Sequence, residues 1–202
     1  MIQIGDQIWS ENDFDITKYI NGEPLYPANT PAEWEFAFNN KIPAYCNYKN
    51  LEEKNQGKIY NHHVVEQAKE IVPNGWRIPF ESDFDQLFNY IIKSNNIQNI
   101  GFKLPPVATH LKSISGWSRQ NGINSVDFNA QPCGIISKIL GYSNYDLIDN
   151  QDSLVYWMNH NNEYPLVLFL SNYEFPEKRI IPASWKYDWG CSIRLIKETN
   201  QR

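Results

Sequence analysis

The sequence has few cysteines and no long hydrophobic run. Cys46, Cys133 and Cys191 are its three cysteines, and their wide, irregular spacing offers neither a CxxC pair nor the even-numbered set of a secreted disulfide framework, so we expect reduced thiols. No window approaches about 18 consecutive apolar residues, so we expect no membrane insertion. The opening MIQIGDQIWSEND lacks the apolar core of a signal peptide, and we expect synthesis in the cytoplasm without one.

Basic residues are also scarce. Lys and Arg together number 18 against 23 acidic residues, which gives a formal net charge of -5. Because nucleic-acid binding takes most of its affinity from cations that neutralise phosphates, we expect no nucleic-acid partner. Aromatic residues, in contrast, make up 14% of the 202 residues and hydrophobic residues 42%, as in a folded domain large enough to have its own core.

Recognisable catalytic and metal-binding motifs are missing. The chain has no HExxH, GxSxG, GxxxxGK[ST] or GxGxxG, so we predict no catalytic residue, no metal ligand and no cofactor. His62 and His63 are neighbours whose side chains would point about 100° apart on a helix, so we expect one packed and one solvated. His110 and His160 stand alone.

One acidic segment leaves a calcium site open. NYDLIDNQDS offers the carboxylates of Asp146, Asp149 and Asp152, but it lacks the DxDxDG spacing of a calcium loop. A solvated loop is the favoured interpretation.

Local signals predict two to three helices early in the chain. Thr30-Pro31-Ala32-Glu33 supplies an N-cap hydroxyl, a proline in the first turn and a capping-box carboxylate. Residues 63–72 carry apolar side chains at helical spacing before Pro73-Asn74-Gly75 ends the pattern. From Phe84 to about Asn95, apolar residues recur at intervals of three and four, which indicates an amphipathic helix with one face toward the core.

Strand patterns fill most of the remaining chain. IQIGDQIW alternates as an edge strand would, with Ile2, Ile4 and Ile8 loosely to one side. After Ser113, strands and loops are predicted by short runs of aromatic and β-branched residues: GWSRQNG, VDFNAQPCG, SLVYWMN, YPLVLFLSN and GCSIRLIKE. Helices early and short antiparallel strands late predict one loop-rich α+β domain over residues 1–202.

Eight segments resemble, in sequence and order, the Fibrobacter succinogenes major paralogous domain family. They are IGDQIWSENDFD, PAYCNYKN, GKIYNHHVV, PNGWRIPFESDFDQL, LKSISGW, VDFNAQPCG, VYWMN and GCSIRLIKE. The resemblance implies a C-type-lectin-like fold, shared more distantly with formylglycine-generating enzymes and phage variable receptor-binding proteins. Formylglycine-generating relatives hold copper with two C-terminal cysteines, where this chain has only Cys191. The HxxxHxE spacing of the iron-dependent sulfoxide synthases is also absent.

Two departures from the family pattern lead to structural predictions. Relatives read Cys-Pro before GWR and Val-Arg-Cys near the end, as if a disulfide joined the two segments. Val72 and Leu195 stand there in this chain, so we expect a hydrophobic contact between them. Phe80 replaces a threonine N-cap, so the following helix should lose its cap or begin later, with Ser82 capping and Asp85 three residues on.

We interpret the NGWRIP segment as a structural joint. Gly75 should allow the turn, Trp76 should enter the core, and Arg77 should pair with a carboxylate or a carbonyl oxygen.

The resemblance and the residues together predict a non-enzymatic recognition module for a cell-surface glycan or protein. Its specific form would be a phage virion protein for host attachment or capsid decoration, since such proteins need no signal peptide. The alternatives are a structural subunit that buries its aromatic face against partner chains, and an enzyme on a degenerate formylglycine-generating scaffold. Rigid rings and amides suit binding surfaces, although each ring could instead fill the core. By analogy with the fold, the candidate ligand-binding residues are Trp117, Asn121, Tyr156, Trp157, Asn159, Tyr187 and Trp189.

Overall fold

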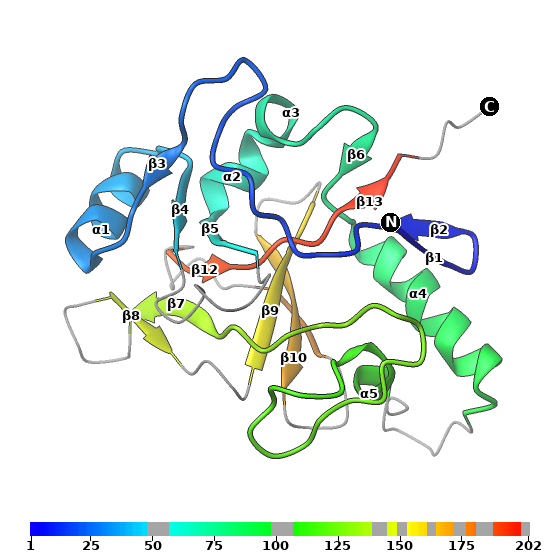
Figure 1. Ribbon diagram of the computed structural model, residues 1–202. Coiled ribbons are helices and arrows are strands. Elements are labelled where there is room, and N and C mark those ends of the chain that lie inside the picture. Colours follow the sequence, from blue (N-terminus) through cyan, green and yellow to red (C-terminus); the bar gives the residue numbers. More distant parts are fainter. Residues whose placement is uncertain are drawn as a thin grey trace.

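The protein is an α+β domain whose described helices all precede residue 112 (Figure 1). The structure, a computed structural model, describes residues 1–47, 57–97, 107–138, 145–148, 153–160, 165–171, 177–180 and 188–198. The helices in these ranges are α1 (Pro31–Asn39), α2 (His62–Glu66), α3 (Ala68–Ile71), α4 (Glu81–Ser94) and α5 (Val107–Leu111). None of these described helices has the length and apolar character needed to cross a bilayer.

The described strands form three small sheets. The first has the order β1-β2-β13-β6 and joins the two ends of the chain, from β1 (Ile2–Ile4), β2 (Gln7–Trp9), β13 (Ile196–Lys197) and β6 (Trp76–Arg77). The second has the order β3-β4-β5-β12-β7-β8, from β3 (Tyr26–Pro27), β4 (Ala44–Cys46), β5 (Ile59–Asn61), β12 (Gly190–Cys191), β7 (Ile135–Lys138) and β8 (Tyr145–Ile148). The third is β11 (Glu177–Ile180), β10 (Leu166–Ser171) and β9 (Ser153–Met158). The pairings between these named strands are antiparallel except that of β3 with β4.

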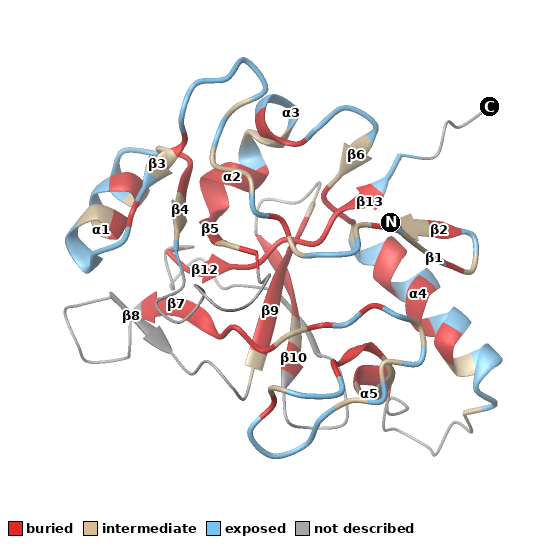
Figure 2. Cartoon of the chain, viewed as in Figure 1, coloured by how far each residue is buried: buried red, intermediate tan, exposed pale blue. Residues whose placement is uncertain are grey.

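Strand β9 lies at the centre of the molecule and is buried on both faces (Figures 1 and 2). Leu154, Tyr156 and Met158 point into one hydrophobic cluster, and Val155 and Trp157 point into a second. Successive side chains of a strand alternate between the two faces of the sheet, so an unbroken apolar run is what a doubly covered strand requires. The core is therefore two clusters divided by the β9–β10 layer.

Helix α1 confirms the capping prediction. The Thr30 hydroxyl accepts a hydrogen bond from the Glu33 backbone N–H at 3.3 Å, and the Glu33 carboxylate accepts one from the Thr30 N–H at 2.9 Å. These two bonds satisfy donors that the first turn of a helix would otherwise leave open. Trp34 and Ala37 are its buried residues.

Helix α4 also forms where predicted, and it has lost its side-chain N-cap, which was one of the two expectations; it does not begin later. It begins at Glu81, and the Asp83 carboxylate reaches back to the Phe80 backbone N–H at 2.7 Å. Phenylalanine has no side-chain acceptor, so this single bond acts as the cap, and neither Ser82 nor Asp85 is needed. The buried face is Phe84, Leu87, Phe88 and Ile91, at the predicted helical spacing.

Several sequence predictions are wrong in detail. IQIGDQIW is a hairpin rather than one strand, because Gly5, with φ of 60°, starts a two-residue turn between β1 and β2. The helix predicted over residues 63–72 is broken at Gln67 into α2 and α3. GWSRQNG and VDFNAQPCG form a hydrogen-bonded loop without strands, and strands also occur in the first half of the chain.

Candidate functional site

The residues predicted as one ligand face are spread through the structure. Four of them are buried side chains of the core: Trp117, Tyr156, Trp157 and Trp189. Asn121 is exposed and Asn159 is half-buried, while Tyr187 lies outside the described residues.

The physical reason for this correction is the alternation along β9. Tyr156 and Trp157 are both 0% exposed and point to opposite faces of the strand, so they do not share a surface. The Trp157 indole N–H donates to the Tyr60 carbonyl at 2.8 Å, which satisfies its polar atom inside the core. The unbroken apolar run SLVYWM was the sequence signal for burial on both faces.

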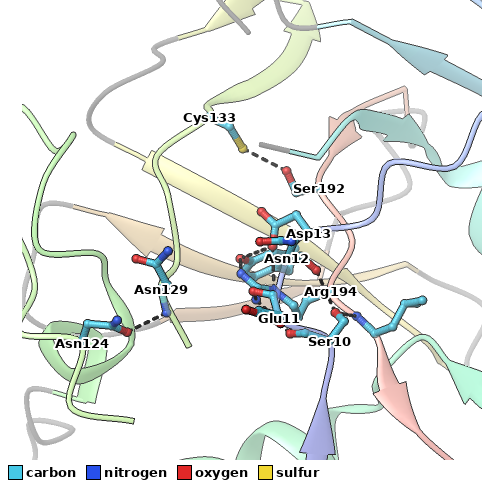
Figure 3. A network of polar contacts seen from close by, with 11 residues as sticks. Ser10, Glu11, Asn12, Asp13, Asn124, Asn129, Cys133, Ser192 and Arg194 are labelled. Atoms are coloured by element: carbon cyan, nitrogen blue, oxygen red, sulfur yellow. Dashed lines mark hydrogen bonds and ion pairs between the residues drawn. The ribbon is translucent and has the colours of Figure 1, made fainter. Parts of the chain in front are cut away.

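A buried ion pair holds the middle of the molecule together (Figure 3). Arg194 donates to the Asp13 carboxylate at 2.6 Å, and its two terminal nitrogens reach the carbonyls of Ser10 and Glu11 and the hydroxyl of Tyr156. The Tyr156 hydroxyl also donates to Asp13, at 2.8 Å. Three segments distant in sequence are thus tied by charge-assisted hydrogen bonds.

The electrostatics of this network favour the charged pair. Burial alone would lower the pKa of Arg194, but Asp13 and Tyr156 outweigh it, and the pKa is raised. Burial raises the pKa of Tyr156 well above its usual value, so the phenol keeps its proton and remains a donor to Asp13. We regard the network as structural, because the side chains of Arg194 and Asp13 are only 2% and 7% exposed.

The network supports a loop, residues 113–131, which we call the 113–131 loop. The Arg194 guanidinium lies 4.5 Å from the centre of the Phe128 ring, and Phe128 is 0% exposed. Trp117 is a second anchor: its indole N–H donates to Ser113 and to the Ala130 carbonyl, and the Lys112 ammonium lies 4.1 Å from the centre of its ring. Two buried rings therefore fix the loop from beneath.

Backbone hydrogen bonds fix the rest of the loop. Gly122 N–H donates to the Ser113 carbonyl at 2.7 Å, and the Asn129 N–H donates to the Asn124 side chain at 2.7 Å (Figure 3). Asn124, Asp127 and Asn129 have φ of 48°, 57° and 52°, the left-handed region that Asn and Asp adopt more readily than other non-glycine residues. Such backbone persists only where its surroundings enforce it.

Above these anchors the loop exposes a mixed surface. Eight polar side chains on it are exposed: Ser115, Ser118, Arg119, Gln120, Asn121, Ser125, Asp127 and Asn129. Asn121 also accepts the Trp117 backbone N–H at 3.1 Å, so it helps to shape the loop. Of all the sequence-predicted ligand-binding residues, Trp117 and Asn121 are the two that the structure brings together here.

The NGWRIP segment has the predicted character of a joint. Gly75 has a φ of 79°, and Arg77 forms a two-point ion pair with Asp83 at 2.6 and 2.8 Å. Trp76 is half-buried at the edge of the second cluster rather than deep in it. Arg77 thereby ties β6 to the first turn of α4.

Val72 and Leu195 are buried in the same hydrophobic cluster, with exposures of 5% and 6%. The expected direct contact between the two side chains stays a prediction, which their burial in one cluster supports. The second cluster is packed around them.

The three cysteines form no disulfide, and two of them are inert by burial. Burial raises the pKa of the Cys133 thiol to about 12 and raises that of Cys191 well above its usual value. Neither of these two thiols takes part in a disulfide. Only Cys46 is partly exposed.

This arrangement predicts the thiol chemistry of the folded protein. One thiol per chain should react rapidly with Ellman's reagent at pH 8, and three should react in 6 M guanidinium chloride. Cys46→Ser should abolish the rapid phase. Two or more rapid thiols in the folded protein would show that Cys133 or Cys191 is accessible, contrary to the structure.

His62 and His63 are both buried, so the expectation that one would be solvated is wrong. The Nε2 atoms of His62 and His160 are 3.0 Å apart. His63 forms hydrogen bonds with the Glu66 carboxylate through Nδ1 and with the Phe38 carbonyl through Nε2. His110 contacts Ser125 at 2.7 Å.

Within the described residues, no group of three or more His, Cys, Asp or Glu side chains is placed to hold a metal. Asp149 and Asp152 lie outside those residues, as does the side chain of Asp146.

These features define an α+β domain with a doubly buried central strand and a braced surface loop. The chain belongs to the Fibrobacter succinogenes major domain family, whose model matches residues 2–197. No curated protein and no solved structure gave a significant match. The C-type-lectin-like assignment therefore stays a prediction.

Proposed function

We propose that this chain is a non-enzymatic recognition domain that binds a cell-surface glycan or protein through the 113–131 loop. The observation that carries the proposal is preorganisation: two buried rings and three left-handed residues fix the loop before any ligand arrives. A binding loop that is already ordered loses less conformational entropy when it binds.

The chemistry of the exposed side chains supports the same proposal. Gln120 and Asn121 each offer amide donors and an acceptor, and Ser118 and Ser125 offer hydroxyls. Sugar hydroxyls and peptide groups need such mixed donors and acceptors. Because the rings of Trp117 and Phe128 are buried, they fix the shape of the loop and do not offer a surface on which a ligand could stack.

A non-enzymatic role is supported by the state of the most reactive groups in the central network. Cys133 lies against Ser192 at 2.9 Å, but burial holds its thiol in the protonated, unreactive form. Asp13 is occupied by Arg194 and Tyr156. Each group serves the packing of the core.

The test compares two double variants, each of which removes one cation and one amide side chain, from different surfaces. Arg119→Ala/Gln120→Ala alters the loop, and Lys93→Ala/Asn89→Ala removes one cation and one amide from the exposed face of α4. Binding is measured on a glycan array and, for protein ligands, by pull-down of surface-labelled proteins from the native source. We expect the loop variant to lose at least about tenfold in signal, as when polar contacts worth about 1.4 kcal/mol are lost, and the α4 variant to match the wild type. Equal binding by the two variants, or none by the wild type in either assay, would contradict the proposal.

Stoichiometric copper or iron in the purified protein would favour the enzyme alternative instead.

An assembly subunit is the second candidate function, and two isoleucines favour it. Ile114 and Ile123 are 68% and 56% exposed, and the Gly122–Ser113 hydrogen bond joins their immediate neighbours. Trp157 and Trp189 would not form that interface, because the chain already buries them. A concentration-dependent increase in mass by light scattering that Ile114→Ser/Ile123→Ser abolishes would support this alternative.

The virion location stays a prediction. Detection of the protein by mass spectrometry in purified phage particles from the native source would support it. Recovery only from uninfected cells would argue against it.

A further inference from the structure

Two histidines separated by 98 positions meet end to end. Their Nε2 atoms are 3.0 Å apart, their planes are within 20° of each other, and their ring centres are 5.3 Å apart. That separation is close to the largest that rings with nitrogens 3.0 Å apart can have. The nitrogens therefore lie on the line between the ring centres, as in an N–H···N hydrogen bond rather than a face-to-face stack.

The groups around the pair determine which ring donates. From α2, the Glu66 carboxylate lies 3.6 Å from His62 Nδ1 and accepts from His63 Nδ1 at 2.6 Å. A hydrogen on His62 Nδ1, facing the carboxylate, leaves His62 Nε2 as the acceptor and His160 as the donor. From β9, Trp157 presents an edge contact to His62 with ring centres 5.4 Å apart. Among the described residues, the ionisable groups facing His62 are Glu66, His63 and His160.

The surroundings of His62 disfavour its charged form. Burial lowers its pKa to about 4; Glu66 opposes this shift, whereas His160 and His63 add to it. His62 is thus a neutral acceptor at neutral pH.

We propose that the His62–His160 pair is an acid-sensitive clasp that holds the end of β9 against α2. The bond needs one bare Nε2, so it persists while at least one ring is neutral. When both rings are protonated, two N–H groups and two positive charges face each other, and the contact opens. The Asn159 N–H still donates to the Pro79 carbonyl, so the opening is local. The clasp does not depend on the ligand of the 113–131 loop.

The direction of the pH dependence follows from the lowered pKa. An opened His62 titrates near 6.5 and the closed one near 4, so the open form binds more protons between these values. The opening equilibrium constant should therefore rise as pH falls, by about a hundredfold between pH 6.5 and pH 4, and then level off.

Hydrogen exchange on the full chain tests the clasp. After correction for intrinsic rates, protection of the α2 amides should fall about a hundredfold from pH 6.5 to pH 4, whereas the Asn159 amide, which donates to the Pro79 carbonyl, should stay protected. His62→Gln, whose amide can donate or accept, should reduce this fall to less than about threefold. His110→Gln, which removes a histidine outside the pair, should behave as the wild type.

An NMR titration of the wild-type imidazole nitrogens makes the test independent of any variant. We expect His62 Nε2 to report an acceptor without a proton at pH 7, with a midpoint near 4. A midpoint near 6.5, unchanged wild-type protection, or an equal fall in His62→Gln would overturn the proposal.

Discussion

Replacing Asp13 with alanine is expected to lower the free energy of unfolding by about 3–5 kcal/mol, because it leaves a buried guanidinium without its counter-charge. Arg194 is 2% exposed, so water does not replace the lost carboxylate. The carbonyls of Ser10 and Glu11 remain as partners, but they carry only partial charge.

The loss should extend to the loop that the network supports. The Tyr156 hydroxyl would lose its acceptor, and the position of Arg194 against Phe128 would no longer be fixed by an ion pair. We therefore expect amide exchange in the 113–131 loop to accelerate in Asp13→Ala more than exchange in α4.

Urea unfolding at pH 7 measures the effect, and Glu11→Ala is its matched control. Both variants remove one carboxylate from the same segment, but the Glu11 side chain is 71% exposed and pairs with the terminal amine. Exposed pairs contribute less than about 1 kcal/mol. If Asp13→Ala falls within about 1 kcal/mol of Glu11→Ala, the ion pair does not stabilise the fold as argued.

The elements that the sequence predicted well are those whose structure depends on interactions between neighbouring residues. Thr30 and Glu33 cap α1 through bonds between neighbours, and the apolar spacing of α4 requires only that one face be covered. The hairpin turn at Gly5 also depends on neighbouring residues. The alternation of apolar and polar residues in IQIGDQIW nevertheless indicated one continuous strand. The family resemblance predicted that Val72 and Leu195 lie together, a relation that no local sequence pattern indicates.

The parts that could not be predicted depend on long-range placement. Asp13 and Arg194 are separated by 181 positions, and His62 and His160 by 98. No periodicity connects such residues, and adjacency on a helix was misleading for His62. The prediction that the aromatic residues form a ligand-binding face was wrong for another reason. Composition cannot distinguish a ring in the core from one on a binding face, whereas the length of an apolar run can.

Introducing cysteines at positions 72 and 195 is expected to form a disulfide that stabilises the protein by about 4–5 kcal/mol relative to its reduced form. Both native side chains are buried in one cluster, where relatives are expected to carry the bonded pair. More than 100 residues separate the positions, and cross-linking so long a loop removes much conformational freedom from the unfolded chain.

The reduced double variant should be less stable than the wild type. Leu195→Cys and Val72→Cys remove buried carbon atoms, and a large-to-small change in a packed core costs about 1–3 kcal/mol. The oxidised form should recover this loss, so the informative comparison is between the oxidised and reduced states of one variant. Adding Cys46→Ser removes the accessible thiol that could form a wrong pair.

Thiol counting in guanidinium chloride and thermal unfolding with and without reductant measure the outcome. The oxidised Cys46→Ser double variant should show two free thiols, those of Cys133 and Cys191, and a higher midpoint than its reduced form. The two single-cysteine variants, which cannot close the loop, should show no response to reductant. Four free thiols after oxidation would mean that the two chain segments do not approach within the roughly 4.4–6.8 Å between Cα atoms that a disulfide requires. That result would contradict the predicted contact between residues 72 and 195.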